Sequence, residues 1–273
     1  METRSVKRRP RRLDLKKTLF LLPNLITLSS IFCGFYAMVI GSHATARDDF
    51  YRASVLIVFA MFFDMLDGRV ARMTRTQSAF GLQIDSLADV VSFGAAPALV
   101  VYQFCLRELG TVGLVASFAF IAAGAVRLAR FNVLTMQASG APTKPGKYIV
   151  GLPIPGAAGI LVALIVASAT VNGGHLTRRG TEVVLGAVIG LALLMVSSVP
   201  FRSMKELKLN VATVSLVVVA LGSSALVSLW LGPAFALLWL LGAYVVLALC
   251  EGSWSLVTRR RRAKDAPQHG SHD

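Results

Sequence analysis

Charged side chains are scarce in this sequence. Asp, Glu, Lys and Arg make up 15% of its 273 residues, whereas hydrophobic residues make up 55%. A soluble domain usually carries about a quarter charged residues, so this composition argues against a protein surrounded by water. We expect most of the chain to form one domain embedded in lipid, with short polar tails.

Cysteine and histidine are rare as well. The sequence contains three Cys and four His, and no two of Cys33, Cys105 and Cys250 stand at the spacing of a zinc or redox motif. Because each cysteine lies in an apolar stretch, we expect all three to be buried free thiols. Zinc is therefore not the metal that this sequence predicts.

Acidic residues number only 14 against 28 Lys and Arg, which gives a net charge of +14. Eight of the basic residues lie in 1–17 and five in 259–264. On a soluble protein such tails would indicate nucleic-acid binding, but beside apolar segments they are typical of topology signals and of contacts with anionic lipid. We therefore expect membrane lipid as a partner and no nucleic acid.

Long apolar stretches dominate the rest of the chain. A helix needs about 20 apolar residues to cross a bilayer, and eight stretches satisfy this requirement: 19–41, 51–72, 82–105, 110–132, 149–171, 182–200, 210–230 and 233–257. The longest connection, 133–148, is rich in Gly and Pro and is predicted to be a loop. The predicted fold is all-α, a polytopic membrane bundle of about eight transmembrane helices.

Basic residues predict the orientation of this bundle. With alternating loops, the side that holds the N-terminus collects 22 Lys and Arg, and the other side collects five. The positive-inside rule then places both termini in the cytoplasm. We divide the chain into a basic cytoplasmic N-terminal segment, a six-helix functional core, two additional transmembrane helices and a basic C-terminal tail, at 1–18, 19–200, 201–257 and 258–273.

Four aspartates stand out within this apolar background. Asp64 and Asp67 are three residues apart on the second stretch, and Asp85 and Asp89 are four apart on the third, so each pair shares a helix face. Asp64 and Asp89 each lie eight residues from the loop that joins the two stretches, a depth of about 12 Å. A tight hairpin would therefore bring all four carboxylates to one level on the cytoplasmic side.

Such a cluster needs a chemical explanation. One Asp near the middle of a membrane helix costs about 2.5–3.5 kcal/mol, and neighbouring carboxylates repel each other. A bound divalent cation resolves both problems, and oxygen-only ligands suit Mg²⁺, Mn²⁺ or Ca²⁺. Four carboxylates are enough for two ions that share ligands. We predict Mg²⁺ or Mn²⁺ as the cofactor, with two ions.

Small residues follow the first aspartate pair. Gly68 and Ala71 clear space beside Asp67 and Arg72, which would let a ligand approach the backbone. Small residues also serve helix packing in membranes, but their alternation with Asp67 and Arg72 favours ligand contact. Metal ions beside cationic side chains suit a diphosphate, and a deeper carboxylate can accept the proton of an attacking hydroxyl.

The spacing D-x2-D-G-x2-A-R-x8-G-x3-D-x3-D resembles the signature of the CDP-alcohol phosphatidyltransferase family. It is filled at every position, by Asp64, Asp67, Gly68, Ala71, Arg72, Gly81, Asp85 and Asp89. The segments LPNLITL, IDSLADVVSFGAAPA, RLARFN and GLPIPGAA are similar to the phosphatidylserine synthase branch of that family. Family enzymes displace CMP from a CDP-linked lipid with an alcohol hydroxyl, and they depend on divalent metal.

The resemblance implies a role for each matching residue. Asp64, Asp67 and Asp85 would hold one ion, and Asp89 would share a second ion with Asp64 and Asp85 and act as the general base. The CDP moiety would lie along the residues Asn24, Thr27, Asp67, Gly68, Ala71, Arg72 and Gly81. Many integral enzymes of this kind are dimers, so a homodimer is a further expectation.

The resemblance also implies an acceptor alcohol. The branch transfers phosphatidyl from CDP-diacylglycerol to L-serine, and the serine carboxylate needs a cation. Arg127 and Arg130, with Asn132 beside them, are the first candidates, and Lys144 and Lys147 are weaker ones. The positive-inside rule would place these basic residues at the same membrane surface without any substrate. The expected location is a bacterial inner membrane, with the active site facing the cytoplasm.

The four aspartates also allow other functional interpretations. The same donor could serve glycerol 3-phosphate, inositol phosphate or choline, and the donor could be an archaeal CDP-ether lipid. A different class of protein, a cation transporter, would also place carboxylates within membrane helices. Against a transporter, all four aspartates lie on the predicted cytoplasmic side, without matching acidic residues in the outer half of the bundle.

Overall fold

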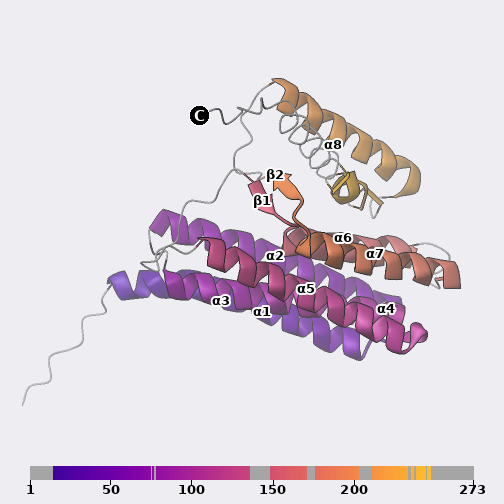
Figure 1. Ribbon diagram of the computed structural model, residues 1–273, viewed down its shortest axis with the longest axis horizontal. Coiled ribbons are helices and arrows are strands. Elements are labelled where there is room, and N and C mark those ends of the chain that lie inside the picture. Colours follow the sequence, from indigo (N-terminus) through magenta and orange to yellow (C-terminus); the bar gives the residue numbers. More distant parts are fainter. Residues whose placement is uncertain are drawn as a thin grey trace, which may run out of the picture.

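The computed structural model describes residues 15–74, 76, 78–135, 148–170, 176–202, 211–232, 235–236, 238–243 and 245–246. Helices account for nearly all of this part of the chain (Figure 1). In order they are α1 (Leu15–Ser42), α2 (Arg47–Thr74), α3 (Ala79–Asp89), the π-helical segment η1 (Val90–Ala95), α4 (Ala96–Phe104), the short 3-10 helix η2 (Leu106–Leu109), α5 (Thr111–Thr135), α6 (Ile154–Thr170), α7 (Arg178–Val196) and α8 (Val211–Leu231).

Four helical runs among the described residues are long and apolar enough to cross a membrane. They are Leu21–Ser42, Ala79–Phe104, Thr111–Leu134 and Arg178–Val196. The chain is therefore an integral membrane protein. The described α-helices begin and end close to the first seven predicted stretches, but the total of about eight crossings stays a prediction. The eighth stretch, 233–257, lies largely outside the described residues.

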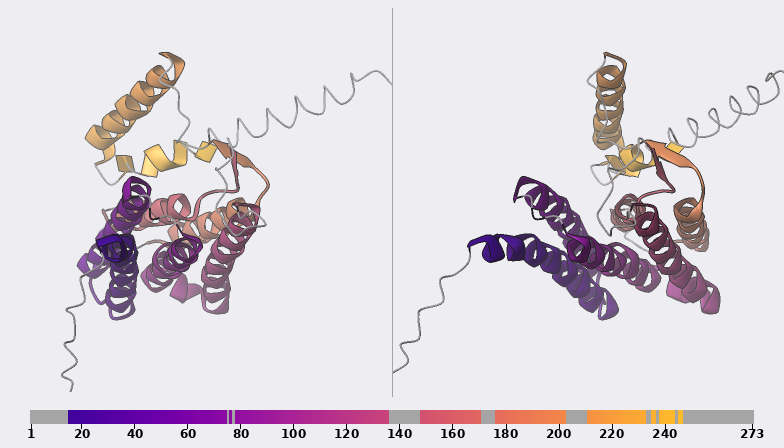
Figure 2. Two further views of the ribbon diagram at one scale, coloured as in Figure 1. Left: turned by 90° about the vertical axis from the view of Figure 1, so that its left-hand side faces the viewer. Right: turned by 60° about the vertical axis from the view of Figure 1, so that its left-hand side comes forward.

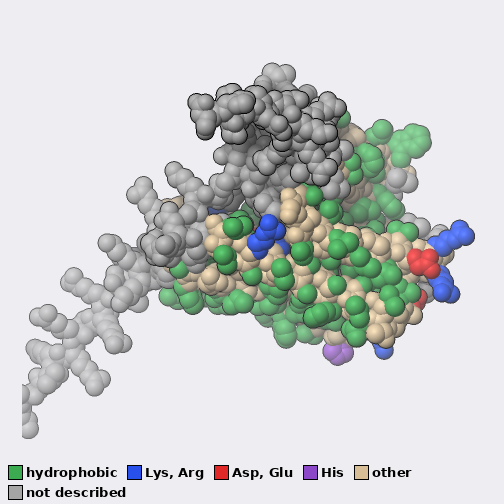
Figure 3. Space-filling view, in the orientation of Figure 1, with side chains coloured by type: hydrophobic (Ala, Val, Ile, Leu, Met, Phe, Trp, Pro, Cys, Tyr) green, Lys and Arg blue, Asp and Glu red, His purple; other side chains and the backbone are tan. Residues whose placement is uncertain are grey.

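The helices α1 to α5 run alongside one another, and α6 and α7 lie against them (Figures 1 and 2). The consecutive segments α3, η1 and α4 form one continuous rod that contacts α1, α2, α5 and α6. Fully buried apolar side chains from most of these elements make the core, the largest being Phe93, Phe120, Ile57, Leu106, Leu152, Ile154, Leu161, Ile165 and Met195. Hydrophobic side chains are also spread across the visible outer face of the bundle (Figure 3), as expected for a surface in contact with lipid.

Two strands of three residues each accompany the helices of this all-α fold. Strand β1 (Tyr148–Val150) pairs antiparallel with β2 (Pro200–Arg202), so the predicted helical stretches 149–171 and 182–200 are wrong at these ends. The physical reason lies at Gly151, whose φ of +79° suits glycine and ends the strand. A Cβ there would stand 2.3 Å from the Met195 carbonyl oxygen, so the chain turns tightly before α6. An apolar composition alone does not distinguish such a corner from a helix.

The π-helical segment η1 begins directly after Asp89. Pro97 follows it at the start of α4 and cannot donate a hydrogen bond to the carbonyl four residues earlier. The wider π turn accommodates this loss, and the Ala96 N–H donates to the Val91 carbonyl instead. The helix face that carries Asp85 and Asp89 is therefore interrupted immediately after Asp89.

A buried polar layer fixes η1 against the first two helices. The Ser92 hydroxyl donates to the Ser30 carbonyl at 3.0 Å, and the Ser30 hydroxyl donates to the Ala60 carbonyl at 3.1 Å. A Cβ on Gly34 would lie only 2.7 Å from the Ser92 Cα, so glycine permits this close approach. Because Ala60 is about one turn from Asp64 on α2, this layer supports the helices that carry the aspartates.

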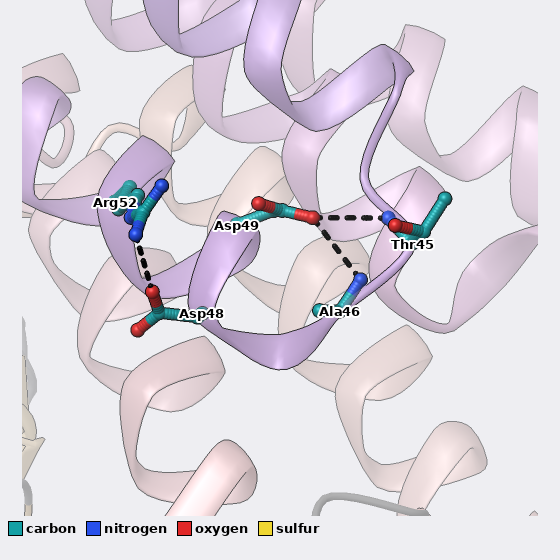
Figure 4. A network of polar contacts seen from close by, with 5 residues as sticks. All are labelled: Thr45, Ala46, Asp48, Asp49 and Arg52. Carbon is teal, nitrogen blue, oxygen red and sulfur yellow. Dashed lines mark hydrogen bonds and ion pairs between the residues drawn. The ribbon is translucent and has the colours of Figure 1, made fainter.

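The opposite end of α2 carries a separate polar network (Figure 4). Asp49 accepts backbone hydrogen bonds from Ala46 and Thr45, each at 3.1 Å, and these bonds lower the pKa of its carboxyl group, which lies outside the predicted span. Asp48 forms an exposed ion pair with Arg52 at 2.8 Å. Carboxylates near a helix N-terminus interact favourably with the helix dipole, so this network stabilises the start of α2.

Candidate functional site

Three carboxylates from two helices meet at the other end of α2. One oxygen from each of Asp64, Asp67 and Asp85 lies within 4.8 Å of the other two. The connection from α2 to α3 is short, and Ser78 caps α3 by accepting the Gly81 N–H at 2.9 Å. The hairpin that the sequence predicts therefore forms, and it brings the first three aspartates together.

Asp89 extends this carboxylate cluster one turn deeper along α3. Its carboxyl group lies within hydrogen-bonding distance of Asp64. One of its oxygens, Oδ1, is buried and has no hydrogen-bond partner among the residues that the structure describes. Arg127 on α5 is close enough for its charge to act on the Asp89 carboxyl. Asp89 therefore offers a buried acceptor beside a cation.

The three-carboxylate cluster fits a hard divalent cation. Carboxylates held within 4.8 Å of one another repel unless a cation lies between them. Oxygen donors are the preferred ligands of Mg²⁺ and Mn²⁺. The residues present therefore fit the metal that the sequence predicts.

Helix α1 contributes a hydroxyl to the cluster. Thr27 Oγ1 donates to Asp67 Oδ2 at 2.6 Å, and the Thr27 and Asp67 residues are each only 4% exposed. Asn24 lies about one turn earlier on α1 and is half-buried. Sequence reasoning assigned Thr27 to the nucleotide and missed its contact with Asp67.

Gly68, directly after Asp67, has open space beside it rather than a packed helix. A Cβ added to Gly68 would meet, within 4 Å, only the guanidinium of Arg72, whose Nη1 would lie at 3.5 Å. Arg72 itself is exposed, and Ala71 is half-buried. Among the described residues no neighbouring helix occupies the space beside Gly68, which favours the ligand interpretation of this glycine over the packing one. Gly81, by contrast, lies beside its helix cap, with Ser78 Oγ 3.2 Å from an added Cβ.

The two arginines predicted to bind the acceptor alcohol, Arg127 and Arg130, both lie on α5 but differ in burial. Arg127 is 8% exposed, and its guanidinium carbon lies 5.9 Å from the ring centre of Phe131. Arg130 is exposed. Asn132 is buried, and its Nδ2 donates to Ser86 Oγ at 2.8 Å. Lys144 and Lys147 lie outside the described residues.

Ser86 on α3 is hydrogen-bonded to α5, the helix that carries the residues predicted to bind the acceptor. Its hydroxyl donates to the Leu82 carbonyl at 3.0 Å while it accepts from Asn132. Because Ser86 follows Asp85 directly, Asn132 holds α5 against the part of α3 that carries the aspartates.

The sequence of the chain matches a known family over most of its length. Residues 20–258 fit the profile of the CDP-alcohol phosphatidyltransferase family. The chain belongs to that family. The match includes every predicted site residue and extends beyond the segments that carry the sequence resemblance, so the predicted family is confirmed.

Several relatives of this CDP-alcohol phosphatidyltransferase share the same name. A CDP-diacylglycerol–serine O-phosphatidyltransferase of Helicobacter pylori is 37% identical over 240 residues, which cover 88% of this chain and 94% of the relative. A protein of the same name in Mycobacterium tuberculosis is 32% identical over 242 residues, or 88% of this chain and 79% of the relative. Another protein of this name, in Bacillus subtilis, is 32% identical over 185 residues, which cover 68% of this chain and 92% of the relative. Family membership makes the chain an enzyme and removes the transporter interpretation of the aspartates.

Proposed function

We propose that this phosphatidyltransferase moves the phosphatidyl group of CDP-diacylglycerol to the hydroxyl of L-serine, giving phosphatidylserine and CMP, and that the reaction depends on divalent metal. The observation that carries the proposal is the three-carboxylate cluster of Asp64, Asp67 and Asp85, combined with a buried Arg127 on α5 whose charge acts on the Asp89 carboxyl. The names of the relatives support the same donor and acceptor.

The carboxylate cluster is the proposed metal site. Asp64, Asp67 and Asp85 would hold one Mg²⁺ or Mn²⁺ ion, and Asp64, Asp85 and Asp89 a second. When bound, the metal neutralises the charge of the diphosphate and of the leaving CMP. Gly68, with its open space, would let the diphosphate approach the α2 backbone. The rest of the nucleotide would contact the residues Asn24, Ala71, Arg72 and Gly81.

Asp89 is the proposed general base. Its buried Oδ1 would accept the proton of the serine hydroxyl, and the hydroxyl oxygen would then attack the phosphorus that bears diacylglycerol. The bond from this phosphorus to the CMP oxygen breaks, and CMP leaves with the electron pair. Arg127 would bind the serine carboxylate, since a guanidinium forms two parallel hydrogen bonds with a carboxylate. Asn132 would hold α5 in register with α3.

The cellular setting follows from the charge distribution. The excess of basic residues on one side supports cytoplasmic termini and a cytoplasmic opening for serine. We place the enzyme in a bacterial inner membrane, where its lipid substrate is present, and a homodimer is the proposed assembly.

The first test of the proposed function is which acceptor alcohol supports CMP release. Purified protein with Mn²⁺ or Mg²⁺ and CDP-diacylglycerol is expected to release CMP when L-serine is added. It is expected to release little with glycerol 3-phosphate, inositol phosphate or choline, because these acceptors lack a carboxylate for Arg127. CMP release that depends on another acceptor would keep the aspartate chemistry and overturn the serine assignment. No release with any acceptor, from folded protein, would overturn the proposed reaction.

A Gly68→Ala variant tests the open space on α2. The added methyl group has room in the structure, since it meets only the flexible end of Arg72, and alanine favours a helix over glycine. We expect the variant to fold normally but to raise the KM for CDP-diacylglycerol about 10-fold or more, because overpacking by a methyl group costs about 1–3 kcal/mol. The KM is measured from CMP release at saturating serine.

Gly186→Ala is the matched control for this variant. Gly186 lies on α7, is exposed, and has open space where a Cβ would stand. It is expected to leave the KM unchanged. If Gly68→Ala behaves in the same way as Gly186→Ala, the space beside Gly68 does not receive the nucleotide.

A further inference from the structure

Three hydroxyl groups on α1 lie within a few residues of one another, and they have different partners. Ser29 donates to the Leu25 carbonyl of its own helix at 2.9 Å, and Ser30 donates to the Ala60 carbonyl of α2 at 3.1 Å. Thr27, in contrast, donates to the carboxylate of Asp67. Thr27 is therefore the member of this set that contacts a proposed metal ligand.

We propose that Thr27 is a positioning residue, whose hydroxyl holds the Asp67 carboxylate in the orientation that binds metal. The inference rests on the proposed metal site, and it differs from a nucleotide contact because Thr27 acts through Asp67. Outer partners of this kind fix the orientation of metal ligands and commonly affect metal affinity strongly.

The geometry of the Thr27 hydroxyl supports this role. Its oxygen lies 2.6 Å from Asp67 Oδ2 and 3.1 Å from the Pro23 carbonyl oxygen. A hydroxyl has one proton to donate, and 2.5–2.7 Å is the range of charge-assisted bonds from a hydroxyl to a carboxylate. The proton is therefore directed to Asp67, and the bond occupies one of the two carboxylate oxygens.

The surroundings of Thr27 make this bond rigid. Both residues are only 4% exposed, so water does not compete freely for the hydroxyl or for the carboxylate. Threonine in a helix has few accessible side-chain rotamers, and those that it favours place Oγ1 near the carbonyl four residues earlier. Pro23 lies at that position. The backbone of α1 thereby holds the hydroxyl, and the hydroxyl fixes the plane of the Asp67 carboxyl group.

The test is Mn²⁺ binding to purified protein in detergent, measured by electron paramagnetic resonance without nucleotide or lipid substrate. Thr27→Val keeps the shape of the side chain and removes the hydroxyl. We expect it to weaken Mn²⁺ binding about 10–100-fold, the usual effect of losing an outer partner. Thr27→Ser retains the hydroxyl and is expected to bind Mn²⁺ within a few-fold of the unaltered protein.

Ser30→Ala is the matched control. It removes a buried hydroxyl that also joins α1 to α2, one turn away, but its partner is a backbone carbonyl and not a metal ligand. We expect it to lower the melting temperature without changing Mn²⁺ affinity. Melting curves without metal show whether each variant is folded, and Thr27→Ser provides the second reading if Thr27→Val is unstable.

The possible results separate this inference from the function on which it rests. Unchanged Mn²⁺ affinity in Thr27→Val, or an equal loss in Thr27→Val and Ser30→Ala, would overturn the positioning role. A Thr27→Val protein that binds Mn²⁺ normally but has lost affinity for CMP would assign Thr27 to the nucleotide instead. If the unaltered protein binds no Mn²⁺, the proposed metal site itself is wrong, and the inference is overturned with it.

Discussion

Replacing Asp89 with Asn is expected to abolish CMP release while the protein stays folded. The amide has the shape of the carboxyl group but cannot accept the serine proton, and loss of a general base typically lowers kcat by about 10²–10⁴-fold. The Asn amide can donate a hydrogen bond to Asp64, the present neighbour of Asp89. The expected loss therefore reflects chemistry and not unfolding. It is measured as kcat at saturating serine and CDP-diacylglycerol.

Asp48→Asn is the control for this substitution. It makes the same chemical change at an exposed aspartate on the opposite end of α2, where only the surface ion pair with Arg52 is lost. Surface ion pairs of this kind contribute little, so activity is expected to stay within about two-fold. Mn²⁺ binding by the Asp89→Asn protein shows whether the triad of Asp64, Asp67 and Asp85 is intact. An Asp89→Asn enzyme with near-normal kcat would remove Asp89 from the role of base.

The second large effect is expected at Arg127. Truncating one member of a buried, hydrogen-bonded charge pair costs about 2–5 kcal/mol, so Arg127→Gln should raise the KM for serine about 30-fold or more. Arg127→Lys retains the positive charge near Asp89 but loses the planar fork of the guanidinium. We expect the lysine enzyme to keep most of its kcat and to show a raised KM for serine. Both constants come from serine titrations of CMP release.

Arg130 offers a control on the same helix. It lies three residues from Arg127 but is exposed, so Arg130→Gln should change the KM for serine by less than about three-fold. The KM for CDP-diacylglycerol should stay constant in both variants, because neither side chain is assigned to the nucleotide. Equal effects at the two positions would indicate that bulk charge at the membrane surface attracts serine, and would exclude a specific site at Arg127.

Much of the aspartate cluster follows from spacing alone. Separations of three and four residues place each pair on one helix face, and the short connection around Ser78 forces the second and third stretches into a hairpin. Counting residues from this loop places Asp64, Asp67 and Asp85 at similar depths on the two helices. The structure shows that their carboxylates do meet. These rules are local, so the spacing within a single sequence is sufficient to locate the cluster.

The remaining features depend on contacts between distant segments. Spacing could not decide that Arg127 is buried while Arg130 is exposed, because both positions lie near one face of α5. The pairing of β1 with β2 depends on segments about 50 residues apart. The bond from Thr27 to Asp67 also joins two helices. A usable signal existed in this last case: Thr27, Ser30 and Gly34 recur at helical spacing along an otherwise apolar stretch, the pattern of a packed helix face.

The pairing of β1 with β2 has a consequence for the order in which the protein is completed during synthesis. The backbone groups of Tyr148–Val150 find their partners in Pro200–Arg202, which leave the ribosome only after α6 and α7 have been made. Helices α1 to α5, with all four aspartates and Arg127, are by then already in the chain. The strand pair therefore closes late, and until it does, the start of α6 lacks the tether that fixes it beside α7. The arrangement of α6 beside α7 is thus completed only after synthesis has passed Arg202.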